Sequence, residues 1–190
     1  MVSLLVRRSL YFLGFVTVLR QFTGYARRKV GAFRLNSTAR EGDILWVKEL
    51  IYNLSVDVNA VDETGDFPLL AAAEHGHVVV VQELLKSETI ELHKQNDRTG
   101  ATALLVAAQN GHAEVVKALL GADTVNKANE QDGTSPLRLA TQSGHREVMK
   151  VLLGAENIHV SKASQATQDP EVVLLGKEAW EKTSHADQRA

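Results

Sequence analysis

Apolar positions between residues 103 and 120 fall at helical spacing in two short stretches, separated by a polar Gly-His pair. They are Leu104, Ala107 and Ala108 in the first stretch, and Val115, Val116, Leu119 and Leu120 in the second. Isolated helices of about two or three turns are marginal in water, so packing must hold them. The pattern predicts a helix-turn-helix unit that cannot bury its own apolar face, with Leu104 and Leu119 buried between neighbouring units.

Three features of this unit recur together along the chain. A turn signal occurs as Asp62/Gly65, Asp97/Gly100 and Glu130/Gly133, and the Gly-His pair as Gly76-His77, Gly111-His112 and Gly144-His145. The apolar pattern of the second helix follows each pair, over residues 80–85, 115–120 and 148–153. Because all three features shift by the same number of residues, they indicate a repeat protein, whose units bury a shared core by stacking.

The repeated motif resembles that of the ankyrin repeat family, through Gly65 to Leu70, Gly100 to Leu105 and Gly133 to Arg138. The resemblance spans about residues 31–162 and implies an all-α solenoid of about four repeats with short β-hairpin connections. The expected bounds are 31–61, 62–96, 97–129 and 130–162. The family's His after the Leu is replaced by Leu70, Leu105 and Arg138, so we expect weaker hydrogen bonding between repeats.

Residues 31–59 are predicted to form a degenerate first repeat, as expected of a terminal unit. Shifting the second repeat back by 34 positions aligns Phe33 with Phe67 and also matches Leu35, Ala39 and Gly42 to Leu69, Ala73 and Gly76. Its second helix spans Leu45 to Ile51, with Trp46, Val47, Leu50 and Ile51 on one face. The aromatic residues Phe33, Trp46 and Trp180 are expected to pack in the core or in a cap.

Other local signals refine this organisation. Two extra residues within Lys86 to Leu92 predict a longer loop, and Pro68 and Pro136 predict helix starts. The run from Val78 to Val81 predicts a core helix with an apolar exposed side. Asp169-Pro170 is a helix-start signal, so residues 163–190 are expected to form a capping helix and a polar tail.

Charge is distributed unevenly along the chain. Of 21 basic and 23 acidic residues, eight basic and no acidic ones lie in residues 1–40, which leaves a net formal charge of −10 on the rest. An acidic repeat body is a poor match for nucleic acid phosphates, so we expect no nucleic acid partner. The chain contains no cysteine, which excludes disulfides, thiolate zinc sites and a cysteine nucleophile.

The N-terminal extension, residues 1–30, leaves several interpretations open. Its uninterrupted apolar run, Leu10 to Leu19, is about half the length of a membrane-spanning helix. The basic start and Gly24-Tyr25-Ala26 resemble a secretory signal with a small-residue cleavage site. The Arg-rich composition without acidic residues resembles a mitochondrial presequence. Arg7-Arg8 resembles a twin-arginine signal. The remaining alternative is an untargeted extension, such as an end cap. Residues 1–26 would contact a membrane or import machinery if they are a targeting segment, whereas an uncleaved N-terminus favours the cytoplasm.

Catalytic chemistry has little support in the sequence. Glu74-His75-Gly76-His77 contains potential metal ligands, but His77 recurs as His112 and His145, so it belongs to the repeat's turn. No phosphate loop, Ser-His-Asp pattern or carboxylate pair stands out. We therefore expect no enzymatic activity, no cofactor and no metal.

The resemblance instead implies a monomeric protein-binding module whose hairpin tips and first helices line a concave groove. The family's contact positions correspond here to Glu63, Thr64, Asp66, Glu74, His75, Arg98, Thr99, Ala101, Gln109, Asn110, Gln131, Asp132, Thr134, Gln142 and Ser143. This groove is acidic at its start and neutral polar beyond it. The alternative function is a regulatory or targeting subunit, directed to a membrane or organelle by the N-terminal segment.

Overall fold

The structure is a computed structural model that describes residues 24–122 and 135–154. Eight α-helices and one π-helix make up this part of the chain. They are α2 (Gly24–Glu41), α3 (Ile44–Lys48), η1 (Glu49–Asn53), α4 (Pro68–Glu74), α5 (Val78–Leu84), α6 (Ala103–Asn110), α7 (Ala113–Ala122), α8 (Pro136–Gln142) and α9 (Arg146–Gly154).

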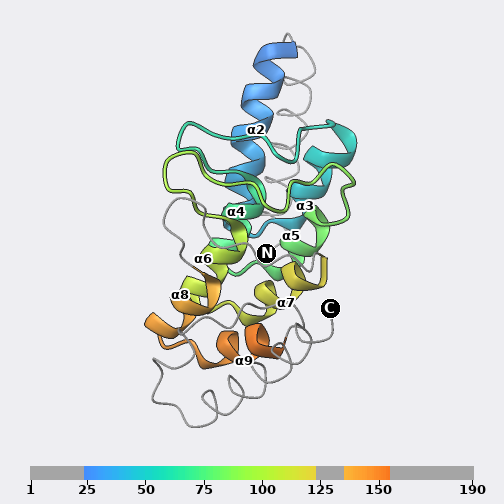
Figure 1. Cartoon of the computed structure of the whole chain (residues 1–190). Coiled ribbons are helices and arrows are strands. Elements are labelled where there is room, and N and C mark those ends of the chain that lie inside the picture. The colour runs from blue at the N-terminus through green and yellow to red at the C-terminus, as the bar shows by residue number, and fades with distance from the viewer. Residues whose placement is uncertain (1–23, 123–134, 155–190) are drawn as a thin grey trace, which may run out of the picture.

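The helices stack in two rows (Figure 1). The first helices α2, α4, α6 and α8 contact one another in sequence order, and α3, α5, α7 and α9 do the same beside them. This order confirms the predicted all-α solenoid. The connections between repeats contain no strand in the described residues. They are turns, closed by backbone bonds such as Asp62 N–H to Asp66 O at 2.9 Å and Asn96 N–H to Ala101 O at 2.9 Å.

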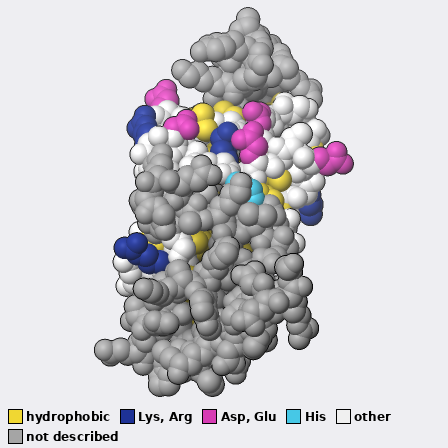
Figure 2. Space-filling view, viewed as in Figure 1, with side chains coloured by type: hydrophobic (Ala, Val, Ile, Leu, Met, Phe, Trp, Pro, Cys, Tyr) yellow, Lys and Arg dark blue, Asp and Glu magenta, His cyan; other side chains and the backbone are white. Residues whose placement is uncertain are grey.

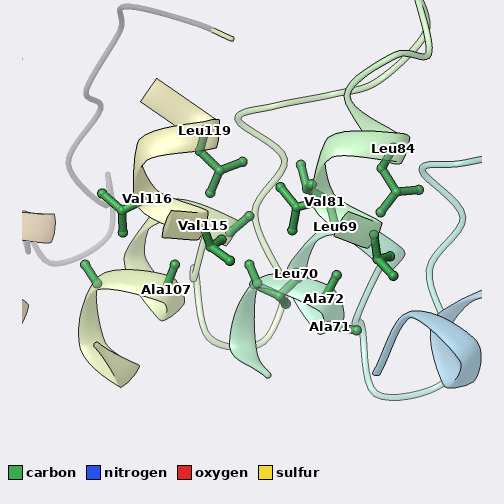
Figure 3. Close-up of a cluster of buried hydrophobic side chains, with 14 of the residues drawn as sticks. Leu69, Leu70, Ala71, Ala72, Val81, Leu84, Ala107, Val115, Val116 and Leu119 are labelled. Atoms are coloured by element: carbon green, nitrogen blue, oxygen red, sulfur yellow. The ribbon is translucent and has the colours of Figure 1, made fainter. Parts of the chain in front are cut away.

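The core runs along the interface between the two rows (Figure 3). Alanines in the first helices, such as Ala72 and Ala107, are fully buried and let neighbouring repeats approach closely, while Val and Leu of the second helices fill the remaining space. Leu119 is only 6% exposed, as predicted. The expectation for Leu104 is wrong, because Leu104 is half-buried at the edge of the core, and its neighbour Leu105 is the leucine of α6 that is buried.

Equivalent residues of the first and second repeats are buried alike, except at the start of the first repeat. Leu35 and Ala39 are fully buried, as Leu69 and Ala73 are. Phe33 is 65% exposed, which contradicts its expected core position. The reason is that α2 is already helical from Gly24, through the expected boundary at residue 31, so Phe33 lies on an outer face of a helix. Its counterpart Phe67 instead precedes α4 in extended backbone and packs inward.

The second helix of the first repeat changes type along its length. Asp43 caps α3 by accepting from the Trp46 N–H at 3.3 Å, and Val47 and Leu50 are fully buried. Trp46 is half-buried rather than fully enclosed, with the guanidinium of Arg34 5.1 Å from the centre of its ring. The turn then widens into the π-helix η1.

The predicted helix starts and the predicted loop are also confirmed. Pro68 and Pro136 occupy the first turns of α4 and α8. The two additional residues of the second repeat fall in the helix-free stretch between α5 and α6. The Asn59 side chain secures this stretch by donating to Thr89 O at 2.6 Å and accepting from the Glu91 N–H at 2.9 Å. The expected cap and tail, residues 163–190 with Trp180, lie outside the described residues.

Candidate partner-binding surface

The tip of the second repeat is a turn before α4 that is built on Asp62. Its carboxylate accepts from the N–H groups of Thr64 at 2.9 Å and Asp66 at 3.1 Å, and from the Thr64 hydroxyl at 2.5 Å. Burial alone would raise the pKa of Asp62, but these hydrogen bonds outweigh burial and hold the pKa below its ordinary value. The turn therefore presents Glu63 and Thr64 to solvent on a fixed backbone.

The tip of the third repeat is organised by a residue that the sequence did not single out. Asn96, rather than the expected Asp97, holds the turn by accepting at Oδ1 from the N–H groups of Arg98 at 2.8 Å and Thr99 at 3.2 Å. The turn is one residue longer than that of the second repeat, since Gly100 is the fourth residue after Asn96 and Gly65 the third after Asp62. Arg98 and Thr99 are exposed, and Ala101 is half-buried.

Asp66, one of the predicted contact residues, is committed to the repeat stack. Its carboxylate pairs with Arg40 Nη2 of the first repeat at 2.9 Å and accepts from Asn96 Nδ2 at 2.8 Å. Asn36 Nδ2 also donates to the Asp66 carbonyl at 2.7 Å. The Asp66 side chain is only 21% exposed. It therefore joins the end of α2 to the turn that begins at Asn96, and its charge is compensated by Arg40.

The predicted residues at the ends of the first helices lie beside another inter-repeat contact. The Glu74 carbonyl accepts from Asn110 Nδ2 at 2.9 Å and His112 Nε2 at 2.9 Å, and the Gln109 carbonyl from His145 Nε2 at 2.8 Å. The side chains of Glu74, His75, Gln109 and Asn110 are exposed, as are those of Gln142 and Ser143 on the fourth repeat.

Three histidines supply hydrogen bonds between neighbouring repeats. His77 Nε2 reaches the Arg40 carbonyl at 2.9 Å, in the same way that His112 and His145 reach back one repeat. Because a carbonyl oxygen only accepts, Nε2 carries the hydrogen in each case. The His of each Gly-His pair therefore joins its repeat to the repeat before it.

The exposed tips of the second and third repeats also contact each other. The Arg98 guanidinium donates to the Glu63 carbonyl, so the two tips form one continuous surface. In Figure 2, acidic and basic side chains are interspersed over the described part of the visible face. With Asp66 compensated by Arg40, the acidic start of the predicted groove is carried by Glu63 and Glu74.

Three further predictions concern the tip of the fourth repeat, metal binding and the membrane. Gln131, Asp132 and Thr134 lie outside the described residues. Within residues 24–122 and 135–154, no group of three or more His, Asp or Glu side chains is arranged to hold a metal ion. Over the same residues, no helix combines the length and apolar character needed to cross a membrane.

Comparison with known proteins places the chain in a family. The family model described as "Ankyrin repeats (3 copies)" matches residues 35–128 and 90–164, which together are well over half of the chain. No curated protein matches the sequence. Ankyrin repeats are generally protein-interaction modules and typically non-catalytic. The family match agrees with the two rows of stacked helices and with the recurring Gly-His turns. The chain therefore belongs to the ankyrin repeat family.

Proposed function

We propose that this chain is a non-catalytic protein-binding module that holds its partner against the hairpin tips and first helices of the second to fourth repeats. The observation that carries this proposal is the pairing of exposed polar side chains with a fixed backbone. Glu63 and Thr64 project from a turn held by Asp62, and Arg98 and Thr99 from a turn held by Asn96. Such preorganisation lowers the entropy cost of binding.

The chemistry of this surface favours a partner with a basic anchor followed by a polar stretch. Glu63 and Glu74 provide exposed acids on the tip and first helix of the second repeat, and Arg98 adds a base on the third. Beyond them, Gln109, Asn110, Gln142 and Ser143 are neutral hydrogen-bonding groups. Complementary charges at the rim of an interface mainly raise the association rate and its dependence on salt.

The size of the array sets an expectation for affinity. An interface on about four repeats falls near the lower end of the roughly 1,200–2,000 Å² that is usual for specific complexes. We therefore expect micromolar rather than nanomolar binding. Crosslinking and mass spectrometry of the native complex test the proposal, because crosslinks from the partner should map to the hairpin tips and the first helices. Crosslinks confined to α5, α7 and α9 would contradict it.

A further inference from the structure

Exposed large apolar side chains of the described chain are confined to residues 30–79, the start of the array. They are Val30, Phe33, Leu45, Tyr52, Val61 and Val79. Single exposed apolar residues are ordinary on protein surfaces. Their restriction to residues 30–79 calls for a cause specific to this end of the array.

Comparison of the repeats with each other isolates two of these residues. The third position after the turn glycine is Leu45 in the first repeat, Val79 in the second, Glu114 in the third and Glu147 in the fourth. All four side chains are exposed, Leu45 by 76% and Val79 by 57%. The fold thus accepts a charged residue at this position, and folding alone does not explain the apolar residues in the first two repeats.

Leu45 and Val79 are exposed at equivalent positions of the neighbouring second helices α3 and α5, which contact each other, and we call this part of the surface the back patch. Its other members are Lys48 and Tyr52 on α3 and η1, and Gln82 and Lys86 on and after α5. Residues three and seven positions apart share one side of a helix. The buried carboxylate of Glu83 joins the two repeats, since it accepts from the Tyr52 hydroxyl of η1 at 2.8 Å and pairs with Lys48 Nζ of α3 at 3.5 Å.

We propose that the apolar run Leu10 to Leu19 of this chain docks on the back patch. The run is ten residues long, contains no charged side chain and ends five positions before α2. Tethering of this kind gives effective concentrations in the millimolar range for short linkers. The occupant is therefore the apolar segment covalently closest to the two repeats that carry the patch.

The geometry at the start of α2 is compatible with this path. A Cβ on Gly31 would lie 2.8 Å from Val56 Cγ2, so the middle of α2 packs against the chain just after η1. The N-terminal end of α2 continues about 10 Å beyond that contact, at the end of the array shown in blue in Figure 1. The four linking residues span at most about 14 Å. Ten helical residues would span about 15 Å, enough to cover the column from Leu45 to Tyr52.

Charge does not oppose the docking. The patch lysines Lys48 and Lys86 both pair with Glu83, at 3.5 Å and 3.0 Å. The basic residues Arg7, Arg8 and Arg20 flank the apolar run rather than interrupt it. Docking would make this segment unavailable to a membrane or import receptor, so the two uses of residues 1–26 would be mutually exclusive.

Disulfide trapping in the full-length chain tests the proposal directly, because the sequence contains no cysteine. Phe15→Cys and Val16→Cys are each paired with Val79→Cys, and the control pairs use Glu147→Cys, the equivalent position two repeats away. We expect an intramolecular disulfide, visible as a mobility shift without reductant, at least tenfold faster with Val79→Cys. Equal trapping at Glu147→Cys, no trapping at all, or an intermolecular dimer, which would mean that a second copy covers the patch, overturns the proposal.

A double-mutant cycle provides a second measurement without cysteines. The patch variant Leu45→Glu with Val79→Glu uses the residue that the later repeats carry at this position, and the segment variant is Phe12→Asp with Phe15→Asp. Each variant should lower the Tm by about 4 °C or more, and their combination should lower it no further than either alone. Additive shifts, or no shift from the patch variant, contradict the docking.

Discussion

The imidazole of His112 lies over Gly76 of the preceding repeat. A Cβ added at Gly76 would be 2.6 Å from His112 Nδ1, while Nε2 of the same ring donates to the Glu74 carbonyl at 2.9 Å. The pairs His77 with Gly42 and His145 with Gly111 repeat this arrangement. The Gly of one repeat therefore leaves the space that the His of the next repeat fills.

Substitution at Gly76 should be more costly than backbone strain alone predicts. Gly76 and Gly144 have φ of 73° and 72°, and no described atom lies within 4 Å of a Cβ added at Gly144. Both Ala variants pay about 1–2 kcal/mol for the left-handed conformation. Gly76→Ala must also displace His112, which adds about 1 kcal/mol for the lost hydrogen bond. Urea unfolding of the two variants measures the difference, and equal losses would show that the His112 contact is unimportant.

Periodicity predicted that the Gly-His pair is structural, but not which residues it joins. A recurring pair shows that every repeat needs the same chemistry, yet the sequence alone does not show that His112 reaches back to Glu74. The predicted core position of Phe33 was wrong for a related reason. The prediction assumed that a turn precedes the first helix, as in the second repeat. Instead α2 begins at Gly24, and Phe33 lies on its outer face. Contacts within a repeat were thus more predictable than contacts at the array's end.

Core substitutions in the third repeat should distinguish Leu119 from Leu104. Leu119 is buried and Leu104 is half-buried at the core's edge. Leu119→Ala is expected to cost about 2–5 kcal/mol, and Leu104→Ala clearly less. Denaturant unfolding monitored by circular dichroism gives both values. A loss below about 0.5 kcal/mol for Leu119→Ala, which is typical of surface positions, would contradict the core described above.

Asp66 should contribute to stability and Glu63 should not. Asp66→Ala removes the partner of Arg40 and of the Asn96 amide and should cost about 1–3 kcal/mol. Glu63→Ala changes an exposed side chain three residues before Asp66 and should stay within about 0.5 kcal/mol. Thermal unfolding of both variants tests this. If Asp66→Ala unfolds like the wild type, the Asp66 carboxylate does not stabilise the stack and is available to contact a partner, as the repeat motif predicted.

The exposed positions at the tips and helix ends could be predicted from the repeat motif, whereas the ion pairs and hydrogen bonds of the individual side chains could not. The motif placed Glu63, Arg98 and Glu74 on exposed tips and helix ends, where the structure has them. It did not predict that Asp66 is neutralised by Arg40, because Arg40 lies in the degenerate first repeat. It also missed Asn96, since the third turn is one residue longer and only its backbone geometry reveals the capping side chain.

Stability should depend on pH through Glu83. Burial alone would raise its pKa, but hydrogen bonds from Lys86 and Tyr52 and the charge of Lys48 outweigh burial and lower the pKa. A lowered pKa stabilises the fold above the ordinary Glu value of about 4.3, and this stabilisation is lost as pH falls through the folded value. Glu83→Gln should cost about 1 kcal/mol at pH 7, since both lysines are largely exposed.

The pH dependence of the Glu83→Gln effect distinguishes this mechanism from simple loss of packing. The difference in unfolding free energy between the wild type and Glu83→Gln should shrink between about pH 5 and pH 3. Glu114→Gln, at an exposed position of α7, serves as the matched control. A difference that stays constant or grows on acidification contradicts the role assigned to the Glu83 carboxylate.

Binding of the partner to matched variants is the most direct test of the central claim, that the hairpin tips form the interface. Glu63→Ala with Arg98→Ala removes one acid and one base from the tips, and Glu114→Ala with Lys117→Ala removes the same charges from exposed positions of α7. Isothermal titration calorimetry with the partner identified by crosslinking should show at least a tenfold rise in Kd for the tip variant, about 1.4 kcal/mol. The α7 variant should stay within twofold of the wild type. The opposite result, with binding lost in the α7 variant and retained in the tip variant, would contradict the account.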